Sequence, residues 1–430
     1  MKYTITQLTD NNVDDITAQT SKGNAVWSSS DGNDNEIYFY DGDSTRRLTY
    51  NDAFDNIPQI SGDNIAWQQT ETLLGISGGS GILFYDGKTE RIERLADVPN
   101  GLAIPGISGS NVVWGEDIVF GGEVFLYDGE DTSELTDLGV FIPINSGSIS
   151  GDNVVWTSGL DENFEGFGDI FLYDGEDTTR ISDRDLTSAL PSVSGDNVAW
   201  SAAKVVTGNE PADVYFYDGE GTIQLTDDNI QDAVLGISGD NVVWSSGDGF
   251  TESELFFYDG EETIQLTSDE TDVFTGGSIS GNNVVWSESD GEDTEIFLYD
   301  GKTTIQITDN DTDDNLPDID GNTIVWEGDD GSDTEIFLAT LSKTSKTSSS
   351  KAYSVSDSEG TYSYRDSVTE ENGSTSLFEG SETEDRSQSI VDFNFKQVLA
   401  DGTGNIYTSS TSNSSMEDNA IADLILPSET

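Results

Sequence analysis

The chain has 430 residues, with 84 Asp and Glu against 17 Lys and Arg, no His and no Cys, and a formal net charge of −67. This charge argues against nucleic acids and anionic membranes as partners, because both attract proteins through Lys and Arg. Without His or Cys the chain can form no disulfide, no thiolate or imidazole zinc site and no catalytic system that needs a His base. Any bound metal ion would need oxygen ligands.

The chain opens with a short apolar segment that copies the end of a later repeat. Residues 5–9 read ITQLT, and residues 223–226 read IQLT. We therefore predict an outermost strand that lacks a sheet of its own. This opening lacks the apolar stretch of a cleavable secretory signal, so export would use another route. The apolar runs of four to six residues are far shorter than the roughly 18 needed to cross a bilayer, so we expect no membrane insertion.

A repeat of about 42 residues governs the chain from there to residue 341. All eight Trp share one phase of it, with gaps of 40 to 47 residues: Trp27, Trp67, Trp114, Trp156, Trp200, Trp244, Trp286 and Trp326. Each unit carries short β-branched and aromatic runs separated by Gly, Asp and Asn, a pattern that predicts strands. The phrases SGDN before the Trp strand and YDG after the next strand both indicate tight hairpins.

Four short antiparallel strands per unit, repeated eight times, predict an all-β, eight-bladed β-propeller. The eighth unit, residues 317–341, supplies three strands, and the opening strand would complete it and close the ring. The phrases LT, ISGDNVVW and EIFLYDG resemble the TolB-type (WD-like) β-propeller repeat, especially its copies in bacterial and archaeal cell-surface proteins. The chain has SGDN where that repeat commonly has SPDG. The resemblance covers residues 1–341 and implies a fold, since propellers host many activities.

The order of strands places the two short hairpins on one side of the ring. The loop after the Trp strand and the connector between blades then lie on the other side, and their length varies most at residues 68–81, 157–168 and 201–212. Variable loops on a rigid scaffold commonly bind ligands. Six Phe fall in these acidic loops, and they either contact a ligand or cap the core: Phe54, Phe120, Phe164, Phe167, Phe250 and Phe274.

The same loops carry runs of carboxylates, a hard-oxygen ligand set that suits Ca²⁺. One candidate is the alternating string Asp309, Asp311 and Asp313, followed by Asp320; the others are Asp290, Asp293, Asp330 and Asp333. The string departs from an EF-hand loop at its sixth position, where Asp314 replaces Gly. Solvated turn acids that keep the surface soluble are the alternative interpretation.

From residue 342 the repeat stops and the composition shifts to Ser, Thr and Glu. Such a segment buries too little apolar area to offset its ordering entropy, so we expect residues 342–388 to be flexible within a largely disordered tail, 342–430. The acidic end of this tail resembles the uncleaved C-terminal signal of type I secretion. A plain disordered tail is the alternative.

These features predict a monomeric, non-enzymatic binding scaffold, extracellular or on the cell envelope. Its long-loop face would bind a protein or a glycan, with Ca²⁺ as the candidate cofactor and no organic cofactor. Two alternatives stay open. Carboxylates alone can hydrolyse glycosidic bonds, so the chain could be a polysaccharide-active enzyme. Abundant surface acid is also typical of cytoplasmic proteins from salt-loving cells.

Overall fold

The structure is a computed structural model. It describes residues 2–73, 76–98, 104–118, 121–136, 149–157, 168–204, 210–247, 253–267, 276–289 and 291–342, together with five strands between residues 347 and 408. The chain divides into two units, residues 3–341 and residues 342–430 with the first two residues. Every element in the described residues is a strand, and no helix among them could cross a membrane.

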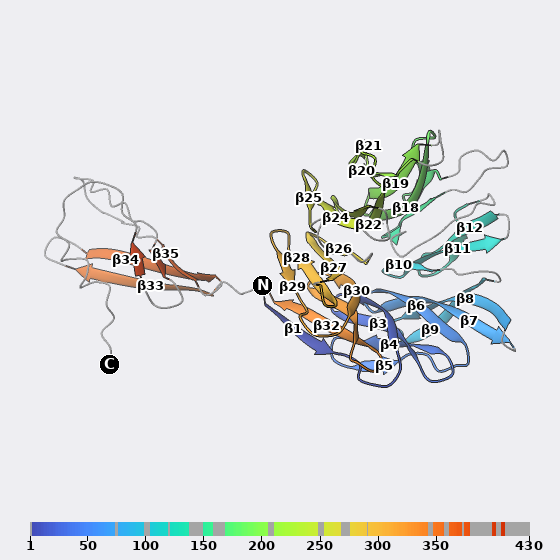
Figure 1. Ribbon diagram of the computed structural model, residues 1–430, viewed down its shortest axis with the longest axis horizontal. Helices are drawn as coiled ribbons and strands as arrows, with labels where there is room; N and C mark the ends of the chain where they lie inside the picture. The colour runs from blue at the N-terminus through green and yellow to red at the C-terminus, as the bar shows by residue number, and fades with distance from the viewer. Residues whose placement is uncertain are drawn as a thin grey trace. The chain divides into compact units, whose positions relative to one another are not determined.

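Residues 2–342 form eight four-stranded antiparallel sheets, which follow one another around a ring in chain order (Figure 1). The first four blades are β2 (Asp15–Ser21), β3 (Asn24–Ser30), β4 (Asn35–Tyr40) and β5 (Thr45–Arg47); β6 (Phe54–Ser61), β7 (Asn64–Leu73), β8 (Ile76–Asp86) and β9 (Arg91–Val98); β10 (Gly106–Ser108), β11 (Asn111–Ile118), β12 (Gly121–Tyr127) and β13 (Thr132–Glu134); β14 (Ile149–Ser150), β15 (Asn153–Thr157), β16 (Ile170–Tyr173) and β17 (Thr178–Arg180).

The other four blades repeat this order from the innermost strand to the outermost. They are β18 (Leu186–Ser194), β19 (Asn197–Lys204), β20 (Asp213–Tyr217) and β21 (Thr222–Gln224); β22 (Asp232–Ser238), β23 (Asn241–Gly247), β24 (Ser253–Tyr258) and β25 (Thr263–Gln265); β26 (Ser278–Ser280), β27 (Asn283–Ser289), β28 (Thr294–Tyr299) and β29 (Thr304–Gln306); β30 (Asp314–Asp320), β31 (Thr323–Asp329) and β32 (Thr334–Ser342), with β1 (Lys2–Gln7) as the outermost strand.

The opening strand completes the last blade. β1 is hydrogen-bonded to β32, and just beyond it the Leu8 N–H donates to the Ile336 carbonyl at 2.8 Å. Each innermost strand packs against the next one around the ring, and β2 of the first blade packs against β30 of the eighth. The predicted eight-bladed propeller, closed by the N-terminal strand, is therefore confirmed.

The Trp residues form the core between neighbouring sheets. All eight are buried, and in seven blades the indole stacks on the aromatic ring opposite it in the third strand, at 5.7 to 6.1 Å between ring centroids. In the second blade Leu83 faces Trp67 instead. Each indole also packs on apolar residues of the adjoining blade, as Trp326 packs on Val285 and Ile296. The single Trp of each repeat therefore marks the contact between neighbouring sheets.

The SGDN phrase is a clamp between neighbouring blades as well as a hairpin. The Gly195 N–H donates to the Ser150 hydroxyl of the preceding blade at 3.0 Å, and the Asn153 side-chain amide donates to the Gly195 carbonyl at 2.7 Å. Equivalent bonds recur around this face of the ring. The phrase recurs because each copy binds two blades together.

Replacing Gly195 with Ala should destabilise the propeller. Gly195 has φ of +59°, a left-handed conformation. Residues other than Gly, Asn and Asp lose about 1–2 kcal/mol of stability when they adopt it. A Cβ would meet no atom within 4 Å, so backbone conformation alone sets the cost. Denaturant unfolding of Gly195→Ala and Gly195→Asn measures this cost. If the two variants are equally stable, the cost does not come from the left-handed backbone conformation.

The second unit contains one five-stranded sheet, in the order β33 (Thr347–Ser356), β34 (Thr361–Glu371), β35 (Ser374–Phe378), β36 (Val398–Ala400) and β37 (Ile406–Thr408). The range for which the composition predicts flexibility, residues 342–388, includes the first three of these strands. The sheet is antiparallel throughout. Its strands are rich in Ser and Thr.

Candidate functional site: acidic junctions between blades

The loop after the Trp strand meets the connector between blades, as the strand order predicts. The Thr334 N–H, at the end of one such loop, donates to the carboxylate of Asp14 in the connector at 3.1 Å. In the same way the Thr294 N–H donates to Asp313 at 3.0 Å. The SGDN clamps lie at the other ends of these strands. At both of these places the long-loop face has a junction built from two separate segments.

A buried carboxylate stands at the centre of these junctions. Seven of the eight blades have Asp or Glu as the first residue of the EIFLYDG phrase: Glu36, Glu123, Asp169, Asp213, Glu254, Glu295 and Glu335. The side chains of Glu36, Glu295 and Glu335 are fully buried. The next residue fixes their position, because its backbone N–H donates to the Thr hydroxyl of the outermost strand's LT phrase, for example Ile296 to Thr308 at 2.8 Å.

In two blades the protein supplies its own cation to this carboxylate. Arg47 donates to Glu36 at 2.5 Å and to Asp31 at 2.9 Å, and Arg180 pairs with Asp169 at 3.3 Å. In the second blade Gly81 replaces the carboxylate, and Arg94 lies where its side chain would be, since a Cβ on Gly81 would fall 2.3 Å from the Arg94 guanidinium carbon. Arg thus stands at this position in the first, second and fourth blades, and a carboxylate faces it in the first and fourth.

The last four blades have a neutral residue where those blades have Arg. The corresponding outermost-strand residues are Gln224, Gln265, Gln306 and Gln7. Gln224 donates to Asp213 at 2.9 Å but brings no positive charge. The carboxylates of these blades thus have no basic partner from this position.

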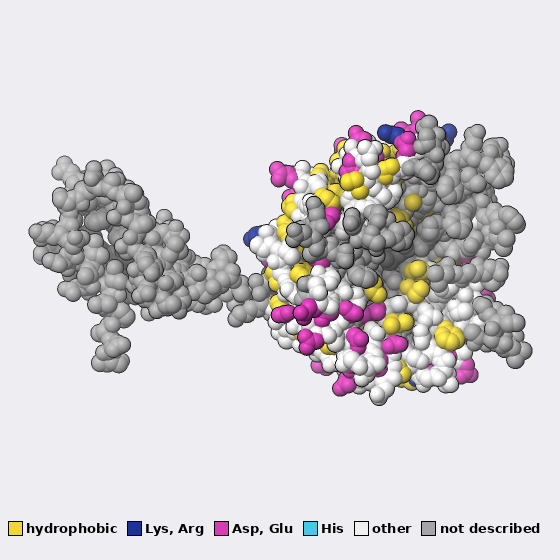
Figure 2. Space-filling model, in the orientation of Figure 1, with side chains coloured by type: hydrophobic (Ala, Val, Ile, Leu, Met, Phe, Trp, Pro, Cys, Tyr) yellow, Lys and Arg dark blue, Asp and Glu magenta, His cyan; other side chains and the backbone are white. Residues whose placement is uncertain are grey.

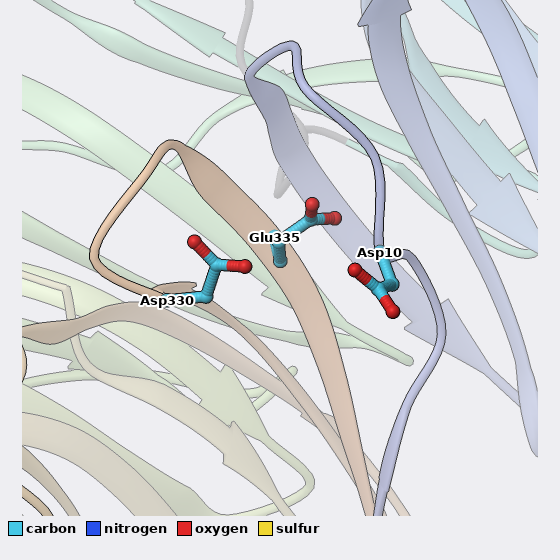
Figure 3. A group of neighbouring side chains, drawn as sticks. All are labelled: Asp10, Asp330 and Glu335. Carbon is cyan, nitrogen blue, oxygen red and sulfur yellow. The ribbon is translucent and has the colours of Figure 1, made fainter.

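Three groups of carboxylates in the described residues have oxygen atoms within 4.8 Å of one another. They are Asp10, Asp330 and Glu335; Asp31, Asp34 and Glu36; and Asp213, Asp228 and Asp232. Figure 3 shows the first group: Asp10 comes from the segment after β1, Asp330 from the loop before β32, and Glu335 from β32 between them. Each group includes the first residue of an EIFLYDG phrase or its equivalent.

Several of these oxygens are buried without a hydrogen-bond donor. Glu335 accepts the Asn11 N–H at 2.7 Å through Oε1, while Oε2 has no partner in the described residues. Both oxygens of the fully buried Asp232 also lack one in good geometry, although the hydroxyls of Ser246 and Thr226 lie close enough to oppose the effect of burial on its pKa. Buried polar atoms without partners are costly and call for an explanation.

Burial and mutual repulsion disfavour the charged forms of these acids. Burial, followed by repulsion from Asp31 and Glu36, raises the pKa of Asp34 to about 6. Burial is also the main cause of the raised pKa of Asp232 and of Glu335, and the Asn11 N–H opposes it at Glu335. The surroundings of these carboxylates therefore favour their protonated forms.

The structure brings together only part of the metal set expected from the sequence. Asp330 belongs to a carboxylate group, and Asp333 repels Glu335 from close by. Asp309, Asp311 and Asp313 are exposed in the connector before β30. Asp320 lies at the far end of that strand, where it accepts the Lys22 N–H at 2.7 Å and takes the place of the clamping Ser. The alternating string therefore does not converge with Asp320.

The remaining predicted residues are placed as follows. Asp293 precedes β28 and raises the pKa values of Glu295 and Asp314. Phe54 is half-buried at the start of β6, so it is less exposed than a contact residue in a loop would be. Asp290 and the other five predicted aromatic contacts lie outside the described residues: Phe120, Phe164, Phe167, Phe250 and Phe274.

Sequence reasoning missed the central carboxylates, including Glu335, Glu36 and Asp232. A signal was present, because the first residue of the EIFLYDG phrase is acidic in seven copies. A second signal is the Asp 12 residues before Trp27, Trp67 and Trp326, which accepts the indole N–H at 2.8 to 3.1 Å. Acidic residues inside an apolar repeat, rather than in the loops, mark the site.

A separate cleft of about 1130 Å³ lies between the fourth and fifth blades. Its lining includes Arg180, Arg184, Lys204, Trp200 and Tyr215. Three of the eleven basic residues between positions 1 and 341 thus converge on one cleft; the eleven are Lys2, Lys22, Arg46, Arg47, Lys88, Arg91, Arg94, Arg180, Arg184, Lys204 and Lys302. Figure 2 shows basic side chains at the top of the propeller, near β19 and β21 in Figure 1, with acidic side chains beside them.

The fifth blade lacks the acceptor for its indole. Ser188 stands 12 residues before Trp200, where four other blades have Asp. Within the described residues neither the Trp200 N–H nor the Ser188 hydroxyl has a hydrogen-bond partner, and both side chains are buried. Trp200 lines the cleft, but its N–H is buried.

Solved structures share the propeller fold at low sequence identity. The β-propeller domain of the Trilobed protease from Pyrococcus furiosus is 13% identical, with a TM-score of 0.47 over 68% of this chain and 96% of that domain. An acylaminoacyl peptidase from Pyrococcus horikoshii is 13% identical, with a TM-score of 0.46 over 73% of this chain and 57% of the peptidase. A putative TolB from Agrobacterium tumefaciens is 17% identical, with a TM-score of 0.32 over 52% of this chain and 84% of that protein.

This chain spans little more than half the length of the peptidases to which it is similar. No protein-family model matches the chain, and no curated protein matches its sequence. The chain is an eight-bladed β-propeller, and its likeness to these structures concerns the fold alone.

Proposed function

We propose that the protein is a non-enzymatic binding scaffold, extracellular or on the cell envelope, and that it binds a carboxylated glycan in the cleft between the fourth and fifth blades. The observation that carries the proposal is the convergence of Arg180, Arg184 and Lys204 on this cleft in an otherwise acidic protein. A closed ring of stacked sheets holds the cleft walls rigid, so little ordering entropy would be lost on binding.

Two of the basic side chains in the cleft are available to an anionic ligand, although Asp183 and Asp185 also line it. Arg180 is engaged by Asp169 at 3.3 Å, whereas Arg184 and Lys204 are exposed and form no ion pair with any described residue. A carboxylate accepts hydrogen bonds from guanidinium and ammonium groups, and such charge-assisted bonds are the strong ones.

The lining also favours a sugar chain over an apolar peptide. Hydroxyl and amide groups of Ser182, Thr222 and Gln224 line the cleft beside the basic residues. A glycan offers many hydroxyls to such groups, whereas a peptide of similar length would need apolar pockets for its anchors.

Removing one of the free charges should weaken binding. We expect Lys204→Gln to reduce the affinity of the full chain for oligogalacturonate by about 10- to 100-fold, because a hydrogen bond to a charged group contributes roughly 1.5–3 kcal/mol. Calorimetric titration measures the affinity, and neutral maltooligosaccharide serves as the comparison ligand.

The matched control is Lys302→Gln, which makes the same charge change in an exposed hairpin away from the cleft. Equal loss in both variants would show that net charge, rather than the cleft, sets the affinity. Failure of the unaltered chain to bind oligogalacturonate would contradict the glycan proposal. New reducing ends in the same mixture would contradict its non-enzymatic part.

A further inference from the structure

We propose that Asp10, Asp330 and Glu335 form a Ca²⁺ site that fastens the N-terminal segment to the last blade. The three carboxylates have oxygen atoms within 4.8 Å of one another, at the junction where the ring closes (Figure 3). This inference concerns a different site from the glycan cleft and does not depend on it.

The strongest evidence is Glu335, because its charge is buried and only partly satisfied. The side chain is fully buried, Oε1 accepts the Asn11 N–H at 2.7 Å, and Oε2 has no hydrogen-bond partner in the described residues. In Figure 3 the Glu335 carboxylate lies between those of Asp330 and Asp10. A buried ion of this kind is retained only where another charge compensates it.

In the first blade a cation occupies the corresponding position between the carboxylates. There the corresponding Glu36 and the loop acid Asp31 are bridged by the guanidinium of Arg47. In the last blade Glu335 and the loop acid Asp330 occupy the same two positions of the repeat, but the residue corresponding to Arg47 is Gln7. Asp10 adds a third carboxylate where the first blade has Tyr50. The last blade therefore lacks the cation that the first blade has, and Asp10 adds one more carboxylate to it.

The donor set favours Ca²⁺ among the common divalent cations. All ligand atoms are carboxylate oxygens, which hard cations prefer. Ca²⁺ takes six to eight oxygens in flexible geometry, whereas Mg²⁺ demands near-ideal octahedral geometry, and these three carboxylates come from three separate segments. Asp10 and Asp330 are exposed, so water can complete the six to eight ligands that Ca²⁺ takes.

The position of the ligands couples the ion to ring closure. Asp10 directly follows the LT phrase of the opening segment, and Leu8 and Thr9 already bond the backbone of Ile336 at 2.8 Å. Asp330 and Glu335 lie 320 and more residues later. An ion held by all three binds only when β1 is docked on β32, so it stabilises the closed ring by mass action.

The test uses the full chain, freed of metal by a chelator. Ca²⁺ is then titrated by calorimetry, and amide hydrogen exchange of β1 is followed with and without the ion. At a Ca²⁺ concentration of 100 times Kd, exchange that requires undocking of β1 should slow by about 100-fold. Asp330→Asn should remove one ion from the stoichiometry and abolish the slowing. Glu335→Gln, which keeps an acceptor for the Asn11 N–H, should do the same.

Glu262→Gln is the matched control, because Glu262 is exposed in a hairpin of the sixth blade. It should bind as many ions as the unaltered chain and retain the slowing. The proposal is overturned if Asp330→Asn, a change at an exposed loop position, keeps both the full stoichiometry and the Ca²⁺-dependent protection of β1. It is equally overturned if the unaltered chain shows no such protection at millimolar Ca²⁺.

Discussion

Replacing Trp326 with Ala should lower the free energy of unfolding by about 3–5 kcal/mol, the usual cost of truncating a large buried aromatic residue. The indole is 1% exposed and packs on apolar residues of both the seventh and the eighth blade. It also stacks on Phe337 at 5.8 Å. The cavity would lie between two sheets that can approach each other only by distorting the ring, so little of it should collapse.

The loss has a polar component, because the Trp326 N–H donates to the buried carboxylate of Asp314 at 2.8 Å. Trp326→Phe keeps a six-membered ring in the stack and removes this donor together with the five-membered ring of the indole, so it should cost less than Trp326→Ala, about 1–3 kcal/mol. Denaturant unfolding measures both variants. A Trp326→Ala variant within 1 kcal/mol of the unaltered chain would contradict the assignment of the indole to the core between blades.

The fold could be predicted because every blade carries the same physical signals. A Trp at one phase, Gly at the turn that needs positive φ, and apolar runs of strand length recur eight times, and the resulting blade count and closure are confirmed. The inter-blade bonds of the SGDN phrase were not predicted. Gly195 reads as a hairpin residue from its own neighbours, and its bond to Ser150 appears only when blades are placed side by side.

The carboxylate groups were harder to predict, because their members come from separate segments. Asp10 and Glu335 are 325 positions apart and meet only through ring closure. The string from Asp309 to Asp313 drew attention by its local spacing, yet a strand of seven residues separates it from Asp320 at the opposite face. Spacing along the chain indicates a metal loop only where one segment supplies most of the ligands.

The second large effect concerns Asp34, whose replacement with Asn should stabilise the protein at pH 7. Asp34 is 4% exposed, and burial followed by repulsion from Asp31, Glu36 and Asp52 raises its pKa from the ordinary 3.8 to about 6. Arg47 bonds Asp31 and Glu36 rather than Asp34. An Asn has no charge to bury and keeps the shape of the side chain.

The sign follows from proton binding. Below pH 3.8 Asp34 is protonated in both states and costs nothing. Between pH 3.8 and about 6 the unfolded chain loses this proton while the folded chain keeps it, so the free energy of unfolding falls as pH rises. Above pH 6 the cost is complete, on the order of 3 kcal/mol for a shift of about two units. In Asp34→Asn this decrease of the free energy of unfolding between pH 3.8 and about 6 should be absent.

The comparison that isolates burial is Asp259→Asn, which makes the same chemical change at an exposed turn. Asp259 accepts the N–H groups of Glu262 and Glu261 at 2.8 and 2.9 Å, and these bonds lower its pKa. Its contribution is therefore present above its ordinary pKa and is lost as pH falls, so Asp259→Asn should lower stability at pH 7. Thermal melts from pH 4 to pH 8 follow both variants. Since the two carboxylates lie in one acidic protein, opposite signs can arise only from their local surroundings, whereas equal signs would mean that net charge governs the pH dependence.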